Sequence, residues 1–320
     1  MQEFKHNRYK NPSLQRIAVN WDDKYFPLFE RVKNNWNLPI RNFYKKIMGV
    51  TLMGEENSRR QEIKIAIKPI ANERIITRIE NDFSDLDFER IQKIQSFLSA
   101  SKNALCYFAE TPGRYDALED LIDFSEAILK DFELEAFNKQ LLDLLCYGNP
   151  DIFGSYTGSG HDNTNGNIEL YIIPCVLFCE LNHLDLSAFI TIVLAHELAH
   201  GYNHLGIDKD NYYWENFWRT ESALAEGLAQ YYTSQFIEKH QIKNPRGMEI
   251  FELLLKYQNS DYTSFQTWSA TPEKIYAAFI ETRRNNITRC EDFLSYLTGA
   301  KARLKGDKKM EAELGFDFSL

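Results

Sequence analysis

The sequence predicts an α+β fold, with a small sheet beside one long helix and a largely helical C-terminal half. Three observations lead to this prediction. Alternating, β-branched segments typical of strands occur at residues 61–80 and 167–174. Residues 186–205 are apolar nearly all round, as in a helix at the centre of a domain, and helical spacing continues after them. The 320 residues, 44% of them hydrophobic, are enough for one large domain or two modest ones.

Residues 1–83 are expected to form an N-terminal accessory region. Residues 1–60 are polar, contain tryptophans and show no recognisable motif. Residues 61–80 are expected to form two alternating strands around a Pro-Ile-Ala-Asn turn. The remaining residues, 84–320, are expected to form the main domain.

Apolar residues at intervals of three and four predict helices at residues 85–109 and 115–146. The Gly-, Ser- and Asn-rich segment 154–166 lacks the Gly-Lys-Ser/Thr ending of a phosphate loop, so we expect a hairpin connection or a flexible lid. His161 within this segment is expected to be exposed to solvent. Residues 167–174 follow as a short strand that ends at a proline.

The long helix is expected to span about residues 186–205, because Asp185 or Ser187 can cap its first turn and Gly206 can end it. Further helices are expected at about 219–238, 246–258, 272–283 and 290–304.

The long helix contains the motif His196-Glu-Leu-Ala-His200. Residues four apart share one face of an α-helix, about 6 Å apart along its axis, so both imidazoles can bind one ion. Glu197 lies one step round the helix, where its carboxylate can act as a general base toward water that zinc activates. The alternative is a buried helix whose histidines are satisfied by hydrogen bonds.

A catalytic zinc site with two histidines needs a third protein ligand and an open fourth position. Downstream, a helix-forming segment contains Glu221 and Glu226. The context Ala225-Glu-Gly-Leu-Ala229 resembles that of the glutamate ligand in the gluzincin metallopeptidases, a group that includes thermolysin-like enzymes and a family of aminopeptidases. The resemblance favours Glu226, whereas the spacing of Glu221 from the motif is closer to the thermolysin-like value, so Glu221 stays a competing ligand.

The resemblance covers only about residues 196–232, and it implies a zincin-like fold and a zinc-dependent metallopeptidase. It implies one Zn²⁺ per chain, held by His196, His200 and Glu226. Glu197 would then be the general base in the hydrolysis of peptide bonds.

Two features bear on how far this resemblance extends. In the gluzincins an acidic residue lies one turn after the glutamate ligand and orients a ligating histidine, whereas this chain has Gln230, which could still accept a hydrogen bond. The strand before the zinc helix, here residues 167–174, is an edge strand in that group and pairs with the extended substrate. An ordinary sheet strand is the alternative.

His204 lies four residues after His200, as His200 lies four residues after His196. We expect His204 to be a residue at the helix end or a group that supports a metal ligand. Asp208 follows the expected end of the helix and is expected to be a solvated turn carboxylate.

Amide hydrolysis also needs a donor that stabilises the developing oxyanion. We choose Tyr231 because it lies in the helix of the third ligand. The other candidates nearby in the sequence are Tyr202, His204, Tyr212 and Tyr232.

Composition excludes several other classes of function. The net charge of −9 argues against nucleic acid as the main ligand, and no apolar run approaches the length of a membrane span. The polar N-terminus does not resemble a secretory signal, so we expect a cytoplasmic protein. The five cysteines are Cys106, Cys146, Cys175, Cys179 and Cys290; they contain no CxxC pair and are expected to be reduced and mostly buried.

The sequence therefore predicts a metallopeptidase that acts on a peptide or protein substrate. An intracellular regulatory or sensing protein that cleaves or binds one protein partner is the alternative. Hydrolysis of a non-peptide amide also remains open. A purely structural zinc site is disfavoured because it has no use for the carboxylate of Glu197.

Overall fold

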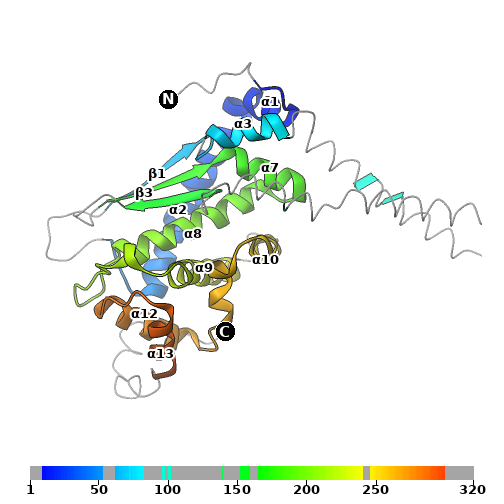
Figure 1. Cartoon of the computed structure of the whole chain (residues 1–320). Helices are drawn as coiled ribbons and strands as arrows, with labels where there is room; N and C mark the ends of the chain where they lie inside the picture. The colour runs from blue at the N-terminus through cyan, green and yellow to red at the C-terminus, as the bar shows by residue number, and fades with distance from the viewer. Residues whose placement is uncertain are drawn as a thin grey trace, which may run out of the picture. The chain divides into compact units, whose positions relative to one another are not determined.

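A computed structural model of the chain (Figure 1) describes residues 9–52, 62–71, 73–82, 96–97, 100–101, 139, 152–158, 165–240 and 246–299. The chain divides into two compact units. Unit 1 comprises Met1–Val32, Ile67–Gly154 and Leu170–Ile190, and unit 2 comprises Lys33–Ala66, Ser155–Glu169 and Thr191–Leu320. The predicted helices at 85–109 and 115–146 lie outside the described residues, apart from a few isolated positions, as do His161, Cys106 and Cys146.

Helix α1 (Pro12–Val19) begins where the side chain of Asn11 accepts a hydrogen bond from the N–H of Leu14, 3.0 Å away. Two further helices of unit 1 are α3 (Glu73–Asp82) and α7 (Ile172–Asn182). The Glu80 carboxylate of α3 accepts hydrogen bonds from the N–H groups of Lys10 and Asn11. Glu180 of α7 pairs with Arg16 of α1. These polar contacts join the three helices within unit 1.

Helix α3 contradicts the prediction of a second strand within residues 61–80. Strand β1 (Glu62–Lys68) forms as expected, but the chain then turns into a helix. Ile75 and Ile79 are four residues apart, and both are buried. That spacing puts them on one face of a helix, and their burial favours this conformation over the alternating pattern of a strand.

The strand predicted at 167–174 is β3 (Asn165–Tyr171), and it ends before the proline. Pro174 is the third residue of helix α7, where a missing N–H costs no helical hydrogen bond. Cys175 and Cys179 lie in α7 as free, buried thiols whose pKa values are raised by burial.

The sheet contains β1, β2 (Gly154–Gly158) and β3 in the order β1-β3-β2. Of the two expectations for residues 167–174, the edge strand is wrong and the ordinary sheet strand is confirmed, because β3 is central and β2 lies at an edge of the described sheet. Strands β2 and β3 are consecutive in the described chain and adjacent in the sheet, as a hairpin connection requires.

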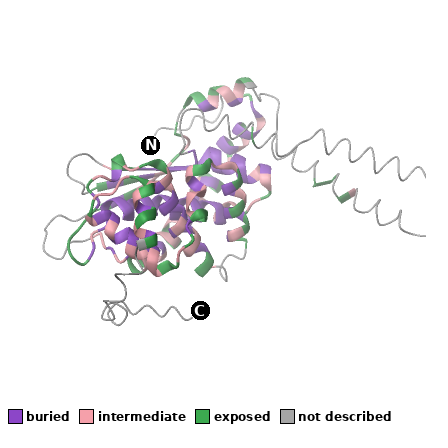
Figure 2. Ribbon diagram, turned by 60° about the horizontal axis from the view of Figure 1, so that its bottom comes forward, coloured by how far each residue is buried: buried purple, intermediate pink, exposed green. Residues whose placement is uncertain are grey.

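Helix α8 (Leu186–Leu205) matches the predicted central helix. The carboxylate of Asp185 caps it by accepting a hydrogen bond from the N–H of Ala188. Within unit 2, the helix packs closely on β1, since a Cβ on Gly201 would lie 2.5 Å from Cδ1 of Ile63. Nearly all of its residues are buried, and Figure 2 shows this as a purple core.

The remaining helices confirm the helical C-terminal half. They are α9 (Ser222–Lys239), α10 (Gly247–Tyr257), α11 (Ser260–Thr263), the 3₁₀ turn η4 (Ser264–Thr267), α12 (Pro272–Arg284) and α13 (Cys290–Gly299). Helix α2 (Phe26–Met48) lies in a region for which the sequence predicted no element, and it has residues in both units. Within unit 2, its Tyr44 hydroxyl donates a hydrogen bond to the Ala195 carbonyl. No helix among the described residues has both the length and the hydropathy needed to cross a membrane.

The C-terminal end of α8 is closed by Arg283 of α12. This arginine is fully buried and donates hydrogen bonds to the carbonyls of Asn203 and Gly206, among others. Burial lowers the pKa of Arg283 to about 10, while the nearby carboxylate of Asp208 favours its charged form. Arg283 therefore remains charged at neutral pH and satisfies carbonyls that the end of a helix leaves without partners.

Candidate metal centre

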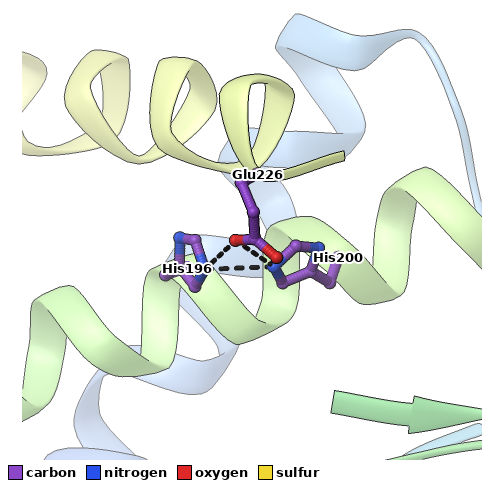
Figure 3. A group of neighbouring side chains, drawn as sticks. All are labelled: His196, His200 and Glu226. Atoms are coloured by element: carbon purple, nitrogen blue, oxygen red, sulfur yellow. Dashed lines mark hydrogen bonds and ion pairs between the residues drawn. The ribbon is translucent and has the colours of Figure 1, made fainter. Parts of the chain in front are cut away.

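Three side chains from two helices converge at one point in unit 2 (Figure 3). The Nε2 atoms of His196 and His200, one turn apart on α8, are 3.0 Å from each other. The Oε2 atom of Glu226, on α9, is 3.2 Å from each of these nitrogens. The structure therefore brings together the three residues predicted as metal ligands.

The spacing of the three atoms fits a shared metal ion. Ligand atoms about 2.0–2.2 Å from a tetrahedral zinc ion lie roughly 3.2–3.6 Å apart, close to the three separations observed. Oε2 of Glu226 is inaccessible to solvent and makes no hydrogen bond, although both nitrogens are within reach. A buried carboxylate oxygen without a hydrogen bond is costly, and a cation at this point would satisfy it.

The charge state of Glu226 also suits a metal ligand. Burial alone would raise the pKa of its carboxyl group, but the adjacent His200 and His196 outweigh burial and hold this pKa well below its usual range. The carboxylate is therefore ionised at neutral pH, as a metal ligand must be.

The competing ligand, Glu221, lies elsewhere. It is the residue just before α9, and its side chain accepts a hydrogen bond from the N–H of Cys290 at 2.8 Å. Its second oxygen is 3.8 Å from the guanidinium of Arg289. Glu221 is half-exposed and is not part of the three-residue group, which leaves Glu226 as the acidic member.

Glu197, the predicted general base, is buried on α8 and only 4% exposed. It follows His196 directly and is thus rotated by about 100° around the helix axis. Glu197 is not a member of the group formed by His196, His200 and Glu226.

Helix α8 continues far enough to include His204, but this histidine faces a different partner. Its Nδ1 atom is 2.8 Å from the hydroxyl of Tyr156, which lies on β2. Burial and the charge of Arg283 lower the pKa of His204 to about 4, so its ring is neutral at physiological pH. Burial raises the pKa of the Tyr156 hydroxyl, which stays protonated.

Aromatic rings that the sequence did not indicate flank the two histidines. The ring of Tyr262, from α11, lies against His196 with the centroids 5.8 Å apart. The ring of Tyr156 is nearly parallel to that of His200 at 6.5 Å, and Phe217 is 6.4 Å from His200. Tyr262 is 66 positions from His196 in sequence and Tyr156 is 44 positions from His200, and no spacing rule connects them to the motif.

The predicted oxyanion donor, Tyr231, is placed away from this group. It follows Glu226 by five residues, which rotates it by about 140° around α9. Its ring contacts Tyr232 and Trp268. Among the described residues, the aromatic rings that lie against His196 and His200 are those of Tyr262, Tyr156 and Phe217. The assignment of Tyr231 as oxyanion donor therefore stays a sequence prediction.

The other residues singled out in the sequence have structural partners. Tyr202 and Tyr232 are buried against Tyr44, and Tyr212 lies under the guanidinium of Arg284. Asp208 is a turn residue as predicted, but it is buried rather than solvated. Its carboxylate accepts hydrogen bonds from the N–H groups of Asp210 and Tyr212 and from the Arg284 guanidinium.

Gln230 does not orient a ligating histidine in this structure. It is buried, and its Nε2 donates a hydrogen bond to Gln258 at 2.9 Å. Its Oε1 atom accepts no hydrogen bond. Gly227, which follows Glu226, allows a close approach between α9 and η4. A Cβ on Gly227 would lie 2.2 Å from Oγ of Ser264 and 2.9 Å from the Trp268 ring.

No family of known proteins, no curated protein and no solved structure matches this chain.

Proposed function

We propose that this protein is a zinc-dependent metallopeptidase whose ion is held by His196, His200 and Glu226. The observation that supports the proposal is the convergence of two imidazole nitrogens and one ionised carboxylate whose side chain is only 15% exposed. Three protein ligands leave one position open, which is typical of catalytic rather than structural zinc sites.

When bound, zinc would supply Lewis acidity, polarising the substrate carbonyl and lowering the pKa of water. Glu197 would take a proton from the attacking water at its carboxylate and return that proton to the leaving amine. Its burial favours this role, because a carboxylate shielded from bulk water keeps the proton within the site.

A peptide is the substrate class that fits the surroundings best. Strand β2 is at an edge of the described sheet, and its Tyr156 lies against the ligand His200. An edge strand can accept an extended peptide as a further strand, which would bring that peptide to the metal group. The resemblance implied that residues 167–174 pair with the extended substrate. We propose that β2 has this role instead.

The test measures bound metal and peptide hydrolysis on four proteins: wild type, Glu226→Gln, Glu221→Gln and Glu197→Gln. Elemental analysis should find about one zinc per chain in wild type, Glu221→Gln and Glu197→Gln, and much less in Glu226→Gln. Glu221→Gln is the matched control because it removes the same charge from a half-exposed residue just before α9, five positions before Glu226.

Hydrolysis of a quenched peptide library should then follow metal content, with one exception. Glu197→Gln should retain zinc yet lose at least about 100-fold in rate, the range expected for loss of a general base. Zinc without any hydrolysis by wild type would contradict the peptidase and favour a binding role. Absence of zinc from wild type would contradict the whole proposal.

A further inference from the structure

The loop between α8 and α9 presents exposed aromatic side chains. Of the large hydrophobic residues exposed in the described part of the chain, three fall within residues 212–218: Tyr212, Tyr213 and Trp218. Exposed aromatic rings on a loop that a scaffold holds in place often mark a binding surface.

This loop is firmly anchored. Trp214 is fully buried, and its indole N–H donates a hydrogen bond to the carbonyl of Ile287 at 3.0 Å. The N–H of Glu215 donates to Asn286, and the carboxylate of Asp208 accepts from the N–H of Tyr212. The backbone that carries the exposed rings is therefore held in place, and it requires little ordering when a ligand binds.

Trp218 is the exposed ring of this loop that packs on Tyr156, a neighbour of the candidate ligand His200. It is 53% exposed, yet its indole lies parallel to the ring of Tyr156 at 5.9 Å, with an interplanar angle of 7°. Tyr156 in turn lies against the ligand His200. Trp218 also makes edge contacts with His204 at 4.9 Å and Phe217 at 5.1 Å.

Strand β2 leaves room for this arrangement. A Cβ on Gly158, the last residue of β2, would lie 2.6 Å from both the Trp218 ring and the His204 ring. The absence of a side chain at Gly158 lets the indole lie at the end of the edge strand. The exposed part of the indole is thus separated from the candidate ligand His200 by one buried ring, that of Tyr156.

We propose that Trp218 forms an apolar subsite that receives a large aliphatic or aromatic side chain of the substrate, close to the scissile bond. This inference rests on the proposed peptidase function and adds a specificity to it. A fixed indole with one face packed and the rest exposed contributes apolar contact area at low entropic cost, and small side chains cannot use that area.

The test uses the zinc-loaded full chain and pairs of quenched ten-residue peptides that are identical except for Phe or Ala at one position. Positions are scanned in turn, and mass spectrometry locates the cleaved bond. Wild type should favour Phe over Ala by about tenfold or more in kcat/KM at one position near that bond. Trp218→Ala should bring the ratio near one, and Trp218→Phe should keep part of it.

Tyr213→Ala is the matched control, because Tyr213 is an exposed aromatic residue of the same loop that interacts with Glu215. It should keep the wild-type ratio. Three results would overturn the subsite and leave the peptidase proposal intact. Wild type could cleave peptides without preferring Phe over Ala, or Trp218→Ala could keep the wild-type Phe/Ala ratio. The third result is a fall of this ratio in Tyr213→Ala as large as in Trp218→Ala.

A binding measurement separates failure of the subsite from failure of the proposed function. Fluorescein-labelled copies of the same peptides are titrated with zinc-loaded Glu197→Gln protein, with and without Trp218→Ala. Tighter binding of the Phe peptide that depends on Trp218 supports the apolar surface even if no variant hydrolyses peptides. Equal affinity for the two peptides in this case overturns it.

Discussion

His204 is a buried histidine one turn after the candidate metal ligand His200, and its neighbours determine its charge. Burial and Arg283 lower its pKa to about 4, whereas an unfolded chain would have a histidine pKa near 6.5. As the pH falls, the unfolded state takes up this proton first. The contribution of His204 to stability is therefore complete above about pH 6.5 and is lost as the pH falls toward 4.

The metal-free protein should lose about 3 kcal/mol of unfolding free energy through this residue between pH 6.5 and 4. His204→Gln keeps a polar side chain opposite Tyr156 but has no such titration. Urea denaturation of both proteins across this range, with a chelator present, measures the difference. A parallel decline in wild type and His204→Gln would show that His204 is protonated in the folded protein.

Helix α8 packs closely against β1 at Gly201, which follows the candidate ligand His200. A methyl group there would lie 2.5 Å from Cδ1 of Ile63 but at an ordinary 3.4 Å from the Tyr156 ring. Alanine normally stabilises a helix by about 1 kcal/mol relative to glycine. Here overpacking, at about 1–3 kcal/mol, should outweigh that gain.

Gly201→Ala should therefore lower the unfolding free energy by about 1–2 kcal/mol. In an Ile63→Val background, which removes the colliding Cδ1 atom, the same change should be neutral or slightly stabilising. Chemical denaturation of the four proteins of this double-mutant cycle measures the coupling. Additive effects of the two substitutions would contradict the close contact between α8 and β1.

Helices α8 and α9 were predictable because their signals are local. A nearly continuous apolar run, a capping Asp185 and a terminal Gly206 define α8, and HExxH is a spacing within one helix. The alternation in residues 73–80 gave a false strand, because short apolar runs fit either period and tertiary burial decides between them. The edge position also could not be read from β3 itself, since it depends on where β1 and β2 pair.

Residues brought to the site by tertiary packing had no sequence signal. Tyr262 reaches His196 because α11 and η4 pack on α9, where Ser264 donates a hydrogen bond to the carbonyl of Ala223 and Gly227 permits the close approach. Tyr156 reaches His200 through the pairing of β2 with β3. Neither contact follows from spacing along the chain.

At the scale of the whole molecule, the candidate metal centre lies entirely within unit 2, although its ligands come from two helices. His200 and Glu226 are separated in sequence by the anchored aromatic loop. A metal ion would therefore join α8 to α9 on either side of the loop that carries the proposed substrate surface. Metal binding, loop position and substrate choice are thus expected to depend on one another.

The most direct test is crystallographic: diffraction data collected on either side of the zinc absorption edge from the zinc-loaded protein. The account predicts one anomalous peak per chain, about 2.0–2.2 Å from Nε2 of His196, Nε2 of His200 and a carboxylate oxygen of Glu226. No peak at this point, or a peak bound instead by Asp208 or by cysteine sulfur, would contradict the metal centre and the peptidase built on it.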